Sequence, residues 1–163
     1  WVCETAGHAG WLRPGSVENP QRIAVLGGGP AGLSCAYYLA LTGRTVDVYG
    51  REAQPGGQLL DMAARGDLPV AALNRDLQGL LVDNIHFVGQ QVPGVTFDIT
   101  ELCNSHSAVY VTADFTDIVG DARSQPGMYG GAAHHTVVEA VAEGRRIAVS
   151  ISGNQTSNTG KLR

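Results

Sequence analysis

The chain has 163 residues, of which 44% are hydrophobic and 16% charged, and its formal net charge at pH 7 is −4. This length favours one compact domain and is too short for a complete enzyme that binds two nucleotides. No apolar run approaches the ~18 residues of a membrane span, and the 11 scattered basic residues argue against a nucleic-acid partner.

Glycine and cysteine usage narrow the class of protein further. Glycine accounts for 22 of the 163 residues, about 13% against roughly 7% on average, so the backbone is expected to approach something closely. Cys3, Cys35 and Cys103 lie far apart, so the sequence predicts no disulfide framework and no metal site. A reducing, cytoplasmic setting is expected.

The predicted elements begin after an irregular arm. Residues 1–20 contain turn formers without periodicity, so they are assigned to an N-terminal arm. Residues 23–26 form a short apolar run that ends in glycines, which is typical of a strand buried on both faces. A helix is predicted over 30–41, with Pro30 at its first position, and a second strand over 45–49 completes a βαβ unit.

The rest of the chain continues the alternation. Helices are predicted over 70–82 and 136–150. Short strands are predicted at 85–88, 109–112 and 118–119. This order predicts an α/β, Rossmann-like fold with a mostly parallel sheet, formed by a domain over 21–151. Residues 152–163 are polar and are expected to form a flexible tail.

The strongest motif is Gly27-Gly28-Gly29-Pro30-Ala31-Gly32. A GxGxxG motif that follows a strand and opens a helix predicts a dinucleotide site. Gly27 allows a tight turn, Gly29 lets the backbone approach a pyrophosphate, and Gly32 lets the helix lie close to the strand. The start of the helix, Pro30 and Ala31, faces the anion. A glycine-rich turn without a ligand is the alternative.

The adenosine end of the site is less regular. The motif is usually followed, about 20 residues later, by an acidic residue that binds a ribose hydroxyl. Position 50 is glycine here, followed by Arg51 and Glu52. Glu52 could reach the ribose from the next turn, and Arg51 could lie against the adenine or a phosphate.

Residues 22–60 resemble the FAD-binding start of two-nucleotide flavoprotein reductases. The similarity is to the small subunit of bacterial glutamate synthase and to the trimethylamine dehydrogenase and 2,4-dienoyl-CoA reductase group. The loop Pro55-Gly56-Gly57-Gln58-Leu59 is similar to a loop of that group that passes near the flavin side of FAD. The resemblance therefore implies that Gly57, Gln58 and Leu59 contact FAD.

Two later segments extend the resemblance. Gly120-Asp121 resembles the late Gly-Asp motif of the group, in which the aspartate binds the flavin ribityl chain. The segment 136–146 is similar to the helix whose N-terminus faces the pyrimidine edge of the flavin.

The pattern at the start of this last helix has a physical meaning of its own. Thr136 and Glu139 form a capping-box pattern, so the amides of Val137 and Val138 are expected at a positive helix end that stabilises negative charge. His134 and His135 precede the helix; they could donate a hydrogen bond to the flavin or simply be solvated.

One part of the resembling reductases is missing. They carry a complete NAD(P)H domain between a strand like 109–112 and the Gly-Asp motif, whereas only residues 113–119 intervene here. A βαβ unit needs roughly 30 residues, so the sequence predicts the FAD half alone.

Cys3 resembles the last ligand of a [4Fe–4S] cluster in the group. The other three ligands are absent, and a plain cysteine is expected.

The sequence therefore predicts an FAD-binding flavoprotein module or subunit that relays electrons within a larger oxidoreductase assembly. Its expected partners are other oxidoreductase subunits, with iron–sulfur proteins among the candidates, and no catalytic side chain is predicted. One alternative is a scaffold that holds ADP or FAD without turnover. Another is an NAD(P)H-binding module, because Arg51 after Gly50 can admit a 2′-phosphate.

Overall fold

A computed structural model describes residues 20–81, 84–119 and 126–156. Within these residues, five strands form one sheet in the order β3-β2-β1-β4-β5, and every neighbouring pair is parallel. The strands are β1 (Arg22–Leu26), β2 (Thr45–Tyr49), β3 (Ile85–Val88), β4 (Ala108–Val111) and β5 (Met128–Gly130). The predicted α/β, Rossmann-like fold with a parallel sheet is confirmed.

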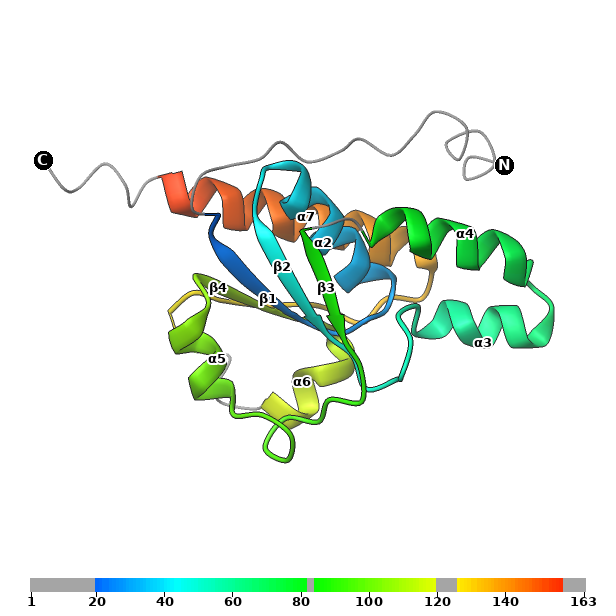
Figure 1. The fold of residues 1–163 in the computed structure, drawn as a ribbon, viewed down its shortest axis with the longest axis horizontal. Coiled ribbons are helices and arrows are strands. Elements are labelled where there is room, and N and C mark those ends of the chain that lie inside the picture. Colours follow the sequence, from blue (N-terminus) through cyan, green and yellow to red (C-terminus); the bar gives the residue numbers. More distant parts are fainter. Residues whose placement is uncertain (1–19, 82–83, 120–125, 157–163) are drawn as a thin grey trace, which may run out of the picture.

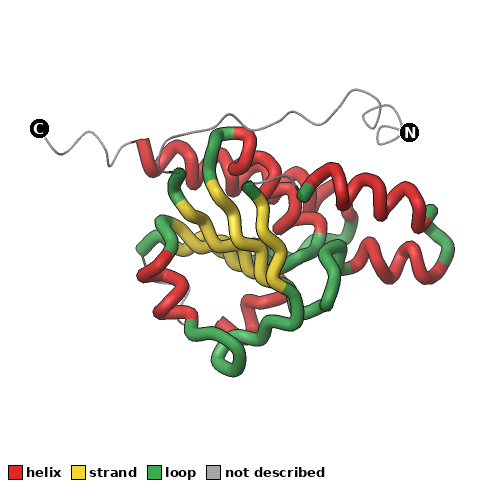
Figure 2. The backbone as a smooth tube through the Cα atoms, in the orientation of Figure 1, coloured by secondary structure: helices red, strands yellow, loops and turns green. Residues whose placement is uncertain are grey.

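Helices cover both faces of the sheet (Figures 1 and 2). On one face, α2 (Pro30–Leu41) and α7 (Val137–Thr156) lie side by side; on the other lie α5 (Ile99–Ser105) and α6 (Ala113–Val119). The remaining two, α3 (Gln58–Arg65) and α4 (Val70–Leu80), form a helical hairpin that projects beside the sheet. Among the described helices, none combines the length and the apolar character needed to cross a membrane.

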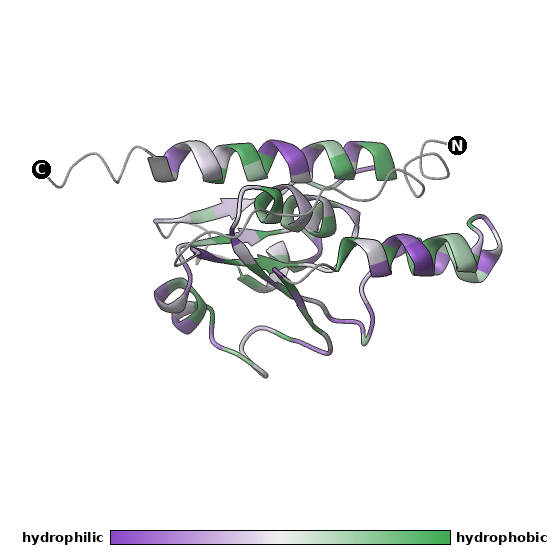
Figure 3. Ribbon diagram, turned by 45° about the horizontal axis from the view of Figure 1, so that its top comes forward, coloured by the Kyte–Doolittle hydropathy of each residue, from purple (hydrophilic) through white to green (hydrophobic). Residues whose placement is uncertain are grey.

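The central strand shows why its sequence is apolar throughout. Ile23 and Val25 pack in the cluster formed with α2 and α7, whereas Ala24 and Leu26 pack in the cluster formed with α5 and α6. All four residues are fully buried, because successive side chains of a strand point to opposite faces. Figure 3 shows hydrophobic residues concentrated in these central strands and a mixture of hydrophobic and hydrophilic residues along α7.

The structure differs from the sequence expectation at several elements. Residues 118–119 belong to α6 and are not a strand; a short apolar pair does not distinguish the two states. The fifth strand is Met128–Gly130, only three residues long at the sheet edge. Helices α3 and α5 were not expected; they are eight and seven residues long, shorter than the stretch of about 11 residues over which a helical period is recognised in sequence.

Helix α7 is longer than predicted. It runs to Thr156, so residues 152–156, which were assigned to the tail, are its last turns. In this part of the helix the Asn154 amide donates to the hydroxyl of Tyr129, at 3.1 Å. That contact joins α7 to β5 and has no signature in the local sequence. The domain boundaries at residues 20 and 151 stay predictions.

Close packing of α2 against α7 depends on one glycine. A Cβ added at Gly144 would lie 2.2 Å from the carbonyl oxygen of Ala31 and 2.8 Å from Cβ of Ser34. Nearby, the Ser34 hydroxyl donates to the carbonyl oxygen of Val141 at 2.8 Å. The two helices therefore touch backbone to backbone, at the end of α2 that also forms the site described below.

We expect Gly144→Ala to lower the free energy of unfolding by about 1–3 kcal/mol, because the new methyl group overlaps backbone that cannot move alone. The matched control is Gly153→Ala in the same helix, where an added Cβ meets nothing within 4 Å. That change is expected to be neutral or to stabilise by up to about 1 kcal/mol, since alanine favours helix over glycine. Urea unfolding of both variants tests this, and equal effects of the two would contradict the packing described.

Candidate dinucleotide site

The predicted glycine motif lies at the point where the strand order reverses. The chain moves from β1 to β2 and β3 on one side, and β4 and β5 lie on the other side of β1. Residues 27–29 connect the end of β1 to Pro30, the first residue of α2. In open parallel sheets, ligands bind outside the carboxyl ends of the strands at such a reversal.

Two of the motif glycines are required by the fold itself. Gly27 has φ +128°, and a Cβ there would lie 2.0 Å from Oγ1 of Thr112. A Cβ at Gly32 would lie 1.8 Å from the carbonyl oxygen of Gly27. A side chain at Gly27 would collide with Thr112 after β4, and a side chain at Gly32 would separate α2 from the end of β1. The contact at Gly32 confirms the close helix–strand approach expected from the motif.

Gly29 differs from the other two. Its backbone is extended, with φ −82° and ψ −175°, a conformation that any residue adopts. A Cβ added there would meet only Oδ2 of Asp114, at the ordinary contact distance of 3.7 Å. The space in front of Gly29 is therefore open, as a backbone that receives a ligand requires.

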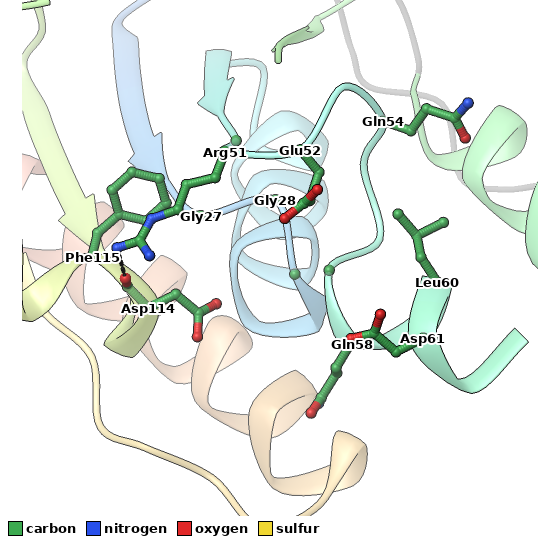
Figure 4. Close-up of a pocket in the computed structure, with 13 residues that line it drawn as sticks. Gly27, Gly28, Arg51, Glu52, Gln54, Gln58, Leu60, Asp61, Asp114 and Phe115 are labelled. Carbon is green, nitrogen blue, oxygen red and sulfur yellow. Dashed lines mark hydrogen bonds between the residues drawn. The ribbon is translucent and has the colours of Figure 1, made fainter. Parts of the chain in front are cut away.

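In the described part of the chain, three surface hollows adjoin one another at this end of the sheet. The first, of about 420 Å³, lies at the ends of β1 and β2 (Figure 4). The second, of about 110 Å³, lies between the start of α2 and the residues that follow β4 and β5. The third, of about 530 Å³, lies between α3 and the start of α7. Gln58 lines all three, so they adjoin at this residue, and together they are called the trough.

Arg51 and Glu52 have different positions in the first hollow. Nη2 of Arg51 donates to the carbonyl oxygen of Asp114, and the guanidinium lies 4.8 Å from the centre of the Phe115 ring. Figure 4 shows Arg51 directed at these two residues and Glu52 projecting into the hollow beside Gly28. Arg51 therefore links the loop after β2 to helix α6 across the first hollow. Glu52 is exposed inside that hollow, where a ligand could contact it.

The far end of the trough is the N-terminus of α7. Oγ1 of Thr136 accepts from the Glu139 amide, and Oε2 of Glu139 accepts from the Thr136 amide, both at 3.2 Å. The Glu139 carboxylate also accepts from the His135 amide. The hydroxyl of Thr136, followed by these amides, holds the pKa of the Glu139 carboxyl below its usual value. The predicted capping box is present, and Thr136 and Val137 line the third hollow.

The structure brings most of the predicted site residues together. Those that line the trough are Gly27, Gly29, Pro30, Ala31, Gly32, Arg51, Glu52, Gly57, Gln58, Thr136 and Val137. Leu59 does not line it, whereas the next residue, Leu60, does. The Val138 side chain points elsewhere and is 78% exposed. Gly120 and Asp121 lie outside the described residues. Which of these residues contact a ligand stays a prediction.

Sequence reasoning missed two acidic residues of the trough. Asp114 follows the end of β4 and lines the first and second hollows; Asp61, on α3, lines the first and third. Asp114 could have been proposed from the sequence, because residues that follow a parallel strand next to β1 lie at the strand reversal, where ligands bind. Asp61 had none, since α3 was not expected.

Comparison with known proteins agrees with this geometry. A family model described as an NAD(P)-binding Rossmann-like domain matches residues 25–76. The chain is 36% identical over 110 residues to glutamate synthase [NADH] of Saccharomyces cerevisiae, covering 66% of this chain and 5% of that protein. It is 33% identical over 104 residues to the NADPH-Fe(3+) oxidoreductase subunit beta of Geobacter sulfurreducens, covering 61% and 15%. The resemblance to the glutamate synthase group is confirmed.

A solved structure shows the same fold over most of both chains. The crystal structure of Thermovibrio ammonificans THI4 superposes with a TM-score of 0.51 at 12% identity, covering 84% of this chain and 90% of that one. The oxidoreductase relatives are much longer, and this chain spans only 5% and 15% of the two named above. Fold, motif and relatives together describe a Rossmann-like dinucleotide-binding module of the kind found in oxidoreductases.

Gly29→Val tests whether the open space in front of Gly29 is the ligand position. We expect nucleotide binding to be lost while the free energy of unfolding changes by less than about 1 kcal/mol, because the side chain enters the trough and not the protein. Gly32→Val is the contrasting variant, and it should destabilise the fold by about 3 kcal/mol or more. Equilibrium nucleotide binding and thermal melting are measured on both; undiminished binding by folded Gly29→Val would contradict the assignment.

Proposed function

We propose that this chain is an FAD-binding module that relays electrons within a larger oxidoreductase assembly. The observation that carries the proposal is that three hollows adjoin at Gln58 and together reach from the end of β2 past Gly29 to the N-terminus of α7. A ligand that used all of it would have an adenosine end, a pyrophosphate and a second group. FAD has this layout, and the motifs shared with the glutamate synthase group favour it.

Each part of the trough suits one part of such a ligand. Glu52 faces the first hollow directly after β2, so it would accept hydrogen bonds from the adenosine ribose. The amides of Ala31 and Gly32 at the start of α2 would receive the pyrophosphate. Thr136 and Val137 belong to the positive end of a helix that stabilises negative charge on a flavin ring.

The charges of the trough support binding through the backbone. Glu52, Asp61 and Asp114 are acidic, and the guanidinium of Arg51 is already engaged by Asp114 and Phe115. A pyrophosphate would therefore depend on main-chain donors, which is the role of glycine-rich turns at helix N-termini. The residues present fit the cofactor.

A bound FAD supplies the redox chemistry, and the chain binds it, orients it and sets its surroundings. Electron donor and acceptor would come from partner subunits in the cytoplasm, iron–sulfur proteins among them.

A second candidate is an NAD(P)-binding module. It is favoured by the description of the matching family model. The contacts of Arg51 count against recognition of a 2′-phosphate, because its guanidinium is held by the Asp114 carbonyl and the Phe115 ring. The test is to identify the ligand released from natively purified protein by mass spectrometry and to titrate the apo-protein with FAD, NADH, NADPH and ADP.

We expect two substitutions to separate the two ends of FAD. Glu52→Ala should weaken FAD and ADP by similar factors, roughly 10-fold, since both ligands carry the ribose. Asp121→Ala should weaken FAD by roughly 10- to 100-fold and leave ADP unchanged, since ADP has no ribityl chain. Glu101→Ala, an exposed acid on α5, is the charge-matched control. Equal losses of FAD and ADP in Asp121→Ala would place Asp121 away from the flavin.

The isolated chain is expected not to oxidise NADH or NADPH at rates typical of enzymes, on the order of 10 per second. Residues 113–119 are too few to form a second nucleotide domain. Stopped-flow absorbance of the FAD-loaded protein mixed with each nicotinamide measures this. Rapid bleaching of the flavin without any other protein would refute the prediction.

A further inference from the structure

A buried carboxylate lies directly behind the second hollow. Glu143 of α7 has a side chain that is only 3% exposed. Its Oε1 accepts from the hydroxyl of Tyr110 at 3.1 Å and from the amide of Ala132 at 2.9 Å. Its Oε2 pairs with Nε2 of His134. A charged carboxylate at this depth is stabilised by a positive partner, because neutral donors alone seldom offset the loss of hydration.

His134 connects this carboxylate to the trough. Its side chain is 18% exposed, and it lines the second hollow opposite residues 29–32, where the pyrophosphate is expected. Among the described residues that line this hollow, it alone can carry a positive charge. Nothing in the sequence distinguishes it from its neighbour His135, which lines the third hollow instead.

Tyr110 and Cys35, which also act on this carboxylate, do not supply that charge. Burial, followed by the charge of Glu143, raises the pKa of the Tyr110 phenol on β4 and of the Cys35 thiol on α2 well above their usual values. Both therefore stay neutral. Arg146 of α7 acts on Tyr110 from the same layer, and Asp114 of α6 adds negative charge to the hollow. Among the described residues, His134 is the basic side chain within ion-pair distance of Glu143.

We infer that His134 is a phosphate-binding residue held as an imidazolium by Glu143, so that the module binds diphosphate-containing adenine nucleotides together with a proton. This inference rests on the proposed function, since it assumes that the trough receives such a nucleotide. It adds a side-chain cation to a site otherwise formed by backbone amides and makes the affinity dependent on pH.

The proton linkage follows from the two ring nitrogens. Nε2 contacts Oε2 of Glu143, and since a carboxylate only accepts hydrogen bonds, we place a proton on this nitrogen. The other nitrogen, Nδ1, can donate only when the ring is charged. Phosphate oxygens are acceptors, so they favour the charged ring, and the charged ring favours them. Glu143 acts through His134 and is a positioning residue.

The experiment compares ADP with adenosine, which lacks both phosphates. We expect His134→Gln to weaken ADP binding roughly 10-fold or more near pH 7, the size of a lost charged hydrogen bond, and to leave adenosine binding unchanged. His135→Gln is the matched control in the same loop, and it should change neither. Thermal melting of each variant shows whether it is folded.

The pH profile supplies a readout that a purely structural role would not move. From about pH 5 to pH 9 the ADP affinity of the unmodified chain should fall relative to that of His134→Gln, as imidazoles lose their charge. The ADP affinity of the unmodified chain is divided by that of His134→Gln because a phosphate group itself titrates near pH 6. The division removes the contribution of the ligand, which is the same for both proteins. Glu143→Gln keeps an acceptor for Tyr110 and Ala132 but removes the charge, so it should weaken ADP at pH 7 and move the fall in affinity to lower pH.

The outcomes separate this inference from the proposed function. If the unmodified chain binds neither ADP nor FAD, both are overturned. If it binds them and His134→Gln leaves ADP affinity and its pH profile unchanged, the inference alone is overturned. Equal losses of ADP and adenosine in the His134 and Glu143 variants would show a structural role and overturn it as well.

Discussion

The close approach of α2 to the end of β1 is the constraint on which the site depends. A single added carbon at Gly32 would fall 1.8 Å from the Gly27 carbonyl oxygen, and one at Gly27 would fall 2.0 Å from Thr112. Thr112 in turn binds the Leu26 carbonyl through both its amide and its hydroxyl, at 2.9 and 2.8 Å. Strand β1, strand β4 and helix α2 therefore meet at one point, which is where the trough begins.

A glycine also permits the close packing of the next layer, in which α7 lies against α2. Gly144 lets the backbone of α7 touch that of α2 near Ala31, and this places α7 so that its N-terminus opens on the third hollow. Helix α7 also carries Glu143 beneath the second hollow. One helix packed through one glycine thus supplies the positive helix end, the buried carboxylate and a wall of the trough.

The electrostatic character of the trough is mixed. Glu52, Asp61 and Asp114 line its first hollow together with Arg51, Arg65 and His135 line its third, and backbone amides at helix starts are its main donors to an anion. An acidic rim suits a ligand whose sugar hydroxyls are donors and whose phosphates are taken up by main chain.

Local signals in the sequence determined the βαβ unit, the glycine motif and the capping box. An apolar run, the spacing of Gly27, Gly29 and Gly32, and a threonine three residues before a glutamate each act within a few residues, so no distant contact is needed to interpret them. The tertiary structure decided which side chains face the trough. Asp114 and Asp61 enter it only because α6 and α3 fold against its edges. His134 differs from His135 only because Glu143, nine residues further on, turns toward it from a packed helix. Such contacts depend on how whole elements pack, and a single sequence does not encode packing in any local pattern.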